Sequence, residues 1–138
     1  STLSHRLSAM GRKRQRPEQT LQKDVCRFLD GALVRNQALY FHVPNGGLRS
    51  KAEAGVLKVL GVKAGVADLC FVWNSGVGPA RVGFIELKAS KGRFSPAQIA
   101  FGDQCGKLKA PCDVAYSVAD VESILLRWCV PMRARLAA

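Results

Sequence analysis

The chain has 138 residues, which is enough for one domain with its own core, and 48% of them are hydrophobic, which argues against wholesale disorder. Its formal net charge of +11 favours a polyanionic partner, nucleic acid before an anionic membrane surface. No apolar run approaches the roughly 18 residues of a membrane span, and the N-terminal sequence lacks a signal-peptide core, so we expect neither a membrane protein nor secretion.

The cysteines are odd in number, scattered, and contain no C-x-x-C pair. This usage is typical of reduced thiols in the cytoplasm, most of which fill the core, rather than of zinc ligands or disulfides. They are Cys26, Cys70, Cys105, Cys112 and Cys129.

The N-terminal residues 1–16 carry five basic side chains and no acid, so we expect either a flexible solvated tail or an arm attracted to phosphates. Pro17 suits the first position of a helix that runs to about Asp30 or Asn36, with an apolar stripe at helical spacing. Glu18 then lies in the first turn, where a carboxylate complements the helix dipole.

Residues Ala38–Val43 are predicted to form the first strand, and His42 within it is interpreted as a core or edge residue rather than a ligand. The turn Pro44-Asn45-Gly46-Gly47 follows. A short helix is expected over Lys51–Leu60, capped by Ser50 and stopped by Gly61.

Two apolar runs, DLCFVW and RVGFIELK, flank the turn-rich NSGVGP and predict a β-hairpin. With Val77 as its midpoint, Asp68 lies directly opposite Glu86, with Cβ atoms roughly 4.5–5.5 Å apart. Two carboxylates so close are unfavourable unless a cation lies between them. Glu86 and Lys88 share one face of the strand, so the spacing predicts a divalent metal site with a lysine alongside.

After the hairpin, Ser95-Pro96-Ala97-Gln98 fits a capping box that opens a helix, and the cap alone is a sufficient role for Gln98. Cys112–Ser117 is expected as a strand parallel to the hairpin's second strand, because a strand–helix–strand crossover is right-handed. A last helix begins near Ser117 and ends before Pro131. The order helix, three strands, helix, strand, helix predicts an α/β fold with a mixed four-stranded sheet flanked by helices.

Four stretches together resemble the PD-(D/E)xK, restriction-endonuclease-like nuclease fold and, within it, the VRR-NUC family of virus-type replication-repair nucleases. E-x-K alone occurs widely by chance, but its combination with the other motifs at these distances is far more specific. The chain departs from the family at Ala67, where proline is usual. The four stretches are Glu18 to Gln22, Asn45-Gly46-Gly47, Gly61 with Gly65-Val66-Ala67-Asp68-Leu69, and Ile85-Glu86-Leu87-Lys88 with Gly92-Arg93-Phe94-Ser95-Pro96-Ala97-Gln98.

The resemblance implies a phosphodiesterase that acts on DNA with Mg²⁺ or Mn²⁺. Asp68, Glu86 and the Leu87 carbonyl would bind the metal, and Lys88 would orient or activate the attacking water. The remaining site residues would come from helices: Glu18, through water if not directly, with Gln98 in support and Gln22 as a weaker candidate. Basic residues nearby, Arg49, Lys51, Lys63, Lys91 and Arg93, together with Asn45, are expected to contact DNA phosphates without reading bases.

Stand-alone members of the family resemble Holliday junction resolvases that act as homodimers, and they are often phage-associated. The resemblance therefore implies a bacterial or phage-encoded protein in the host cytoplasm that cuts four-way junctions. The larger Fanconi-associated nuclease carries extra helices that obstruct such pairing, and this chain has no room for them before Ala38–Val43. The nuclease domain is expected over residues 17–130, with basic tails at 1–16 and 131–138.

Three alternatives stay open. Composition alone favours a non-catalytic, basic nucleic-acid-binding module, although such a module has no need for three of only ten acids in one groove. A flap or restriction-type nuclease on the same fold is the second alternative. A membrane-surface protein that uses its basic tail is the third.

Overall fold

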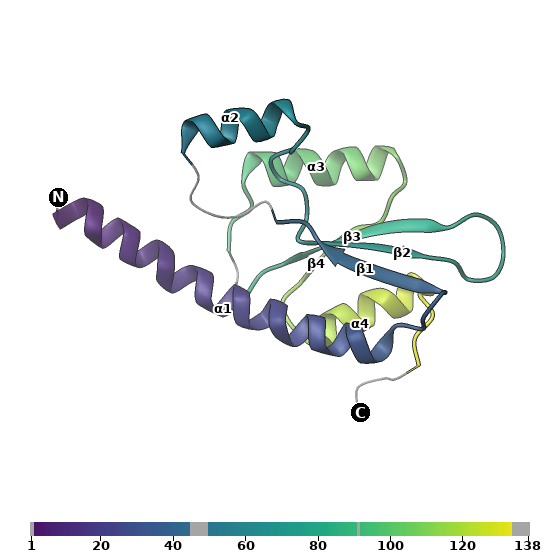
Figure 1. Cartoon of the computed structure of the whole chain (residues 1–138). Helices are drawn as coiled ribbons and strands as arrows, with labels where there is room; N and C mark the ends of the chain where they lie inside the picture. Colours follow the sequence, from purple (N-terminus) through teal and green to yellow (C-terminus); the bar gives the residue numbers. More distant parts are fainter. Residues whose placement is uncertain (1, 45–49, 91, 134–138) are drawn as a thin grey trace.

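The computed structural model describes the backbone of residues 2–44, 50–90 and 92–133, and their side chains from residue 17 onward. Helices and strands follow one another in the expected order (Figure 1). Their bounds are α1 Thr2–Ala32, β1 Ala38–His42, α2 Lys51–Val59, β2 Leu69–Trp73, β3 Arg81–Leu87, α3 Pro96–Lys107, β4 Cys112–Ala115 and α4 Val118–Arg127.

The four strands form one mixed sheet in the order β1-β2-β3-β4. The pairs β1–β2 and β2–β3 are antiparallel, while β3 and β4 are parallel. In Figure 1, α1 and α4 lie on one face of the sheet and α2 and α3 on the other. The predicted fold class, the parallel fourth strand and the helices on both faces are therefore confirmed.

The β2–β3 hairpin has the predicted register. Trp73 pairs with Arg81 and Leu69 with Ile85, so each pair sums to 154 as a Val77 midpoint requires. Because side chains alternate along a strand, this register places Asp68 and Glu86 at one end of the hairpin, on the same face.

The main core lies between the sheet and the two helices α1 and α4. Leu69, Phe71 and Trp73 of β2 are buried there, together with Val25 and Leu29 of α1. Trp128 at the end of α4 stacks on Trp73 with ring centroids 5.5 Å apart. A Cβ at Gly83 would lie 2.6 Å from the Trp128 ring, so the tryptophan fits only against a glycine in β3.

The prediction that the first helix begins at Pro17 is wrong, because α1 begins at Thr2 and includes Pro17 in its interior. Residues 2–16, expected as either a flexible tail or an arm attracted to phosphates, form the first part of this helix. The proline ring fixes φ near −65°, which a helix accepts, and the upstream sequence is rich in helix-forming residues. Glu18 accordingly lies mid-helix, away from the N-terminal end of the dipole.

The other elements differ from expectation by a residue or two. β1 ends at His42 rather than Val43, α2 at Val59 rather than Leu60, and β4 at Ala115 rather than Ser117. The Ser50 cap of α2 is confirmed, and no residue of α2 is buried. On the α3 face of the sheet, Phe84 and Phe101 meet edge to face at 5.1 Å.

Candidate active site

Two carboxylates meet where β2 begins and β3 ends. The backbone N–H of Leu87 donates a hydrogen bond of 2.7 Å to Oδ2 of Asp68, which fixes the aspartate against the neighbouring strand. Beyond Leu69 the antiparallel ladder has ended, so the aspartate side chain takes the place of a backbone partner. This contact is what brings the Asp68 carboxylate to Glu86.

The Glu86 carboxyl group is held in an environment that disfavours its charge. Burial, and after it the nearby Asp68 carboxylate, raise the pKa of Glu86 from 4.5 to about 8, while the charge of Lys88 opposes the rise. In the described part of the chain the one ion pair within 4.0 Å is Arg127–Asp113, so neither acid has a close salt-bridge partner there. Among the described residues the two acids thus lack a cation within salt-bridge distance, a condition that favours a bound metal ion.

Gln98 caps its helix and also contacts Glu86. Its Oε1 accepts the N–H of Ser95 at 2.9 Å, and the Ser95 hydroxyl accepts the N–H of Gln98 at 3.1 Å, so the capping box is complete. Its Nε2 donates to Oε1 of Glu86 at 3.0 Å. The cap fixes the amide in the orientation that presents its NH₂ group to the acid.

Lys88 follows Glu86 by two residues and lies on the same side of the strand. It is the one charged residue recorded as buried among those described, with 8% of its surface exposed. Its Nζ lies 5.2 Å from the centre of the Phe94 ring, within the range of a cation–π contact. Its backbone N–H bonds the carbonyl of Ala115, so β4 fixes the lysine at the end of β3.

Gly65 sets the distance between the loop before Asp68 and the first turn of α3. Its φ is +82°, and a Cβ there would collide with the carbonyl group of Ala97. Only a residue without a side chain allows this approach, and the approach brings the Asp68 loop next to Gln98.

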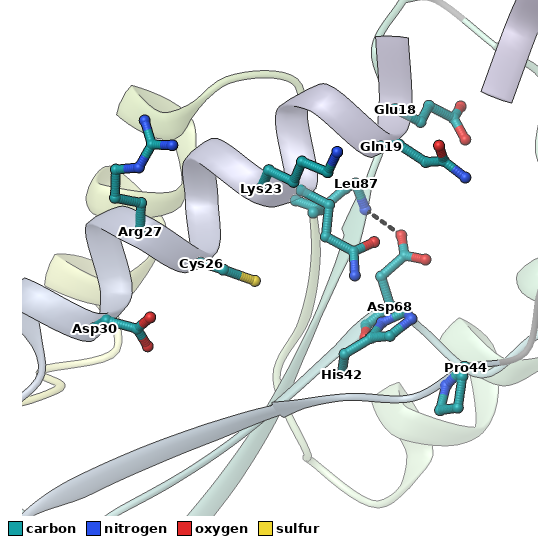
Figure 2. Close-up of a pocket in the computed structure, with 11 residues that line it drawn as sticks. Glu18, Gln19, Lys23, Cys26, Arg27, Asp30, His42, Pro44, Asp68 and Leu87 are labelled. Atoms are coloured by element: carbon teal, nitrogen blue, oxygen red, sulfur yellow. Dashed lines mark hydrogen bonds between the residues drawn. The ribbon is translucent and has the colours of Figure 1, made fainter. Parts of the chain in front are cut away.

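A cavity of about 820 Å³ opens beside Asp68 and Leu87, between them and α1 (Figure 2). Glu18 and Gln22 of α1 line it together with Asp68. However, no group of three or more acidic, histidine or cysteine side chains close enough to hold one ion occurs among the described residues. Glu18 therefore shares the cavity with Asp68 without joining the carboxylate pair.

The structure describes only three of the six residues that are expected to contact DNA. Lys51, Lys63 and Arg93 are exposed, at the start of α2, in the loop before Asp68 and in the loop before α3. Asn45, Arg49 and Lys91 lie outside the described residues.

Sequence reasoning missed several residues of this cavity. The ring of His42 lies beside Asp68, and its Nδ1 is 2.8 Å from the Asp68 carbonyl. Since a carbonyl only accepts, Nδ1 carries the proton. Lys23, Arg27 and Asp30 of α1 also line the cavity. The available signal was their helical spacing from Glu18 and Gln19, which places all of them on one face.

A mixed sheet flanked by helices, with paired acids and a lysine where two strands end, is a nuclease-type α/β fold. The chain belongs to the VRR-NUC family, since the model of the VRR-NUC domain matches residues 10–119. A solved structure described as a VRR_NUC domain protein is similar, with a TM-score of 0.62 and 24% identity over 80% of this chain and 86% of that one. No curated protein matches the chain. No helix in the described ranges is both long and apolar enough to cross a membrane.

Proposed function

We propose that this protein is a metal-dependent, structure-selective DNA endonuclease that hydrolyses phosphodiester bonds. The observation that carries the proposal is the Asp68–Glu86 pair at the strand ends, buried enough to raise the pKa of Glu86 to about 8 and held by Leu87 and Gln98. A fold needs no such pair for stability, since two adjacent carboxylates repel each other.

The donor set fits Mg²⁺ or Mn²⁺. Magnesium takes oxygen ligands, keeps several waters, and uses one or two carboxylates together with substrate phosphate. Asp68 and Glu86 would supply the carboxylates. The Leu87 carbonyl would supply a third oxygen, because in a strand it points to the same side as the Leu87 N–H that reaches Asp68. When bound, the ion stabilises charge on phosphoryl oxygens and acidifies water.

The protein groups have distinct tasks in this proposal. Asp68 and Glu86 bind the cation, Gln98 orients Glu86, and Lys88 holds a water or the phosphate from the α3 side. Glu18 acts from across the cavity, through water. The low exposure of Lys88 keeps its charge poorly screened, so it acts strongly on a phosphate oxygen nearby.

We further propose that the substrate is a four-way junction and that the protein acts as a homodimer, because junction resolution needs two cuts and a two-fold dimer supplies two sites. Support comes from the short connection between α1, which ends at Ala32, and β1, which begins at Ala38. It leaves no space for inserted helices. The five free thiols agree with work in a reducing cytoplasm.

The test is cleavage of linear, flapped and four-way DNA by the purified protein, with and without Mg²⁺ or Mn²⁺. We expect cation-dependent cutting that is fastest on the four-way junction. Glu86→Gln and Lys88→Ala should bind DNA and not cut it. If every DNA survives with wild-type protein, a non-catalytic binding module is the better description. A strictly monomeric mass at micromolar concentration would exclude the dimer.

A further inference from the structure

One face of α1 borders the cavity along three turns. The lining residues fall into two adjacent rows at four-residue spacing, and Figure 2 shows them following the helix away from Glu18. The first row is Glu18, Gln22, Cys26 and Asp30, and the second is Gln19, Lys23 and Arg27.

The two rows have different exposure and different charge. Gln22 and Cys26 are half-buried and form the floor, while Lys23 and Arg27 are exposed at the rim. Neither cation has an acidic side chain within 4.0 Å among the described residues. Four helical residues rise about 6 Å, which is close to the separation of successive phosphates along one nucleic-acid strand.

At the end of the cavity farthest from Glu18, the lining residue Asp30 takes part in a contact between α1 and β1. The Tyr40 hydroxyl donates to Oδ1 of Asp30 at 2.6 Å and lies 3.3 Å from the Cys26 carbonyl. Burial and the hydrogen bond to Asp30 raise the pKa of Tyr40, so the phenol remains a donor. The carboxylate of Asp30 therefore stays at this end, where it repels a further phosphate.

The wall opposite α1 is formed by His42 and Pro44. The His42 ring is fixed by its contact with the Asp68 carbonyl, so this wall is tied to the acid pair. A volume of about 820 Å³ falls within the roughly 300–1,000 Å³ of pockets that bind small ligands, so a nucleotide-sized group fits.

We propose that the α1–β1 cavity binds the DNA strand that flanks the scissile phosphate on one side, with Lys23 and Arg27 contacting two successive phosphates and Asp30 marking the end of the track. This inference rests on the proposed nuclease function. It assigns the position and the length of one subsite. The subsite begins at the acid pair, runs along α1 and holds two phosphates.

The first experiment measures DNA binding as a function of salt. It uses the non-cutting Glu86→Gln protein with fixed Mg²⁺ and the DNA shape that wild type cuts fastest, or a four-way junction if none is cut. Removing two phosphate contacts to duplex DNA lowers the magnitude of the slope of log K against log[salt] by about 1.8. We expect this decrease for Lys23→Ala/Arg27→Ala. Lys58→Ala/Lys107→Ala removes the same charge from exposed positions of α2 and α3 and should leave the slope unchanged.

Equal slopes in the two double variants would overturn the proposal. Lys23→Arg should keep the wild-type slope, and equal melting temperatures exclude a folding defect. A second measurement replaces single phosphates by uncharged methylphosphonates. Two adjacent replacements on one side of the cut should weaken DNA binding by the wild type. They should not change DNA binding by Lys23→Ala/Arg27→Ala. Failure of the wild type to cut any DNA would contradict the nuclease function. The salt slopes test whether DNA occupies the subsite, and they do so independently of cutting.

Discussion

The side-chain amide of Gln98 donates a hydrogen bond of 3.0 Å to the carboxyl group of Glu86, and the same amide caps the helix that carries it. The acid site and the first turn of α3 therefore share one side chain. Any displacement of that turn removes the donor from Glu86.

Gln98→Glu separates these two functions, because glutamate also completes a capping box but has no NH₂ group. We expect cleavage to fall roughly 10–100-fold, the usual cost of losing a partner of a metal-binding residue. The metal-free protein should also lose stability at pH 8, because a third carboxylate then lies beside Glu86. Single-turnover cleavage and urea unfolding measure the two effects. The matched control is Ser95→Ala, which should cost about 1 kcal/mol of stability through the cap. If Ser95→Ala loses more activity than Gln98→Glu, the contact with Glu86 is unimportant.

The stability of the metal-free protein should fall as pH rises from about 5 to 8. The folded pKa of Glu86, about 8, is above its ordinary value of 4.5, so the folded state binds the proton more tightly between these values. The stabilisation by protonated Glu86 is complete below a pH of 4.5 and is lost as the pH rises through the folded pKa of about 8. Urea unfolding in EDTA at several pH values measures it. Subtracting the profile of Glu86→Gln cancels groups common to both chains, and a flat difference would contradict the assigned shift.

Divalent cations should stabilise the protein at pH 8. An ion that binds only the folded state adds about 2.7 kcal/mol at one hundred times its dissociation constant. We expect the midpoint of thermal unfolding to rise with Mn²⁺ in wild type and to stay unchanged in Asp68→Asn, which keeps an acceptor for the Leu87 N–H. A rise of equal size in both proteins would place the ion elsewhere.

Gly65→Ala should lower both stability and cleavage. The substituted Cβ collides with the Ala97 carbonyl at a positive φ, which costs about 1–3 kcal/mol and moves the first turn of α3 away from Asp68. Gly83→Ala is the control, because its Cβ meets the Trp128 ring, and overpacking costs a similar amount. Cleavage well below the unfolding temperature should fall for Gly65→Ala alone. Equal activities would show that the Gly65 contact does not position the site.

Lys88→Met should abolish most cleavage while leaving the affinity for Mn²⁺ and DNA nearly unchanged. Methionine replaces the buried stem, so the loss reports the missing charge, and several kcal/mol of lost stabilisation correspond to on the order of 10³-fold in rate. Cleavage rates, DNA binding and manganese titration test this separately. If Lys88→Met also loses manganese binding, the lysine has a structural role in the pair.

The sequence predicted the sheet and the carboxylate pair for a physical reason. A hairpin turn fixes the strand register, the register places residue 68 opposite residue 86, and the Leu87 N–H holds the Asp68 carboxylate there. The capping box predicted the start of α3 in the same local way. Pro17 misled because the residue suits a helix start and is also tolerated inside a helix at a cost of about 3 kcal/mol. The neighbouring residues of α1 offset that cost, and the proline alone does not indicate whether a helix begins there or continues through it.

Helical spacing puts the cavity residues of α1 on one face, but the cavity itself could not be predicted, because it depends on how α1 lies against β1. The contact of Tyr40 with Asp30 joins residues on different elements, and no local pattern announces it. The contact of Gln98 with Glu86 was expected only from the family resemblance, for a similar reason. A side chain that satisfies a cap leaves no visible sign in the sequence that its remaining donor reaches another strand.

The stacked rings of Trp73 and Trp128 give the molecule its own optical reporter. These are the only two tryptophans of the chain, and Trp73 lies five residues along β2 from Asp68, about 17 Å away. Ultraviolet emission therefore follows disruption of the ring pair and is insensitive to the distant acids. A variant that keeps the native spectrum and has lost its chemistry has an altered site in an intact protein, and this needs no added label.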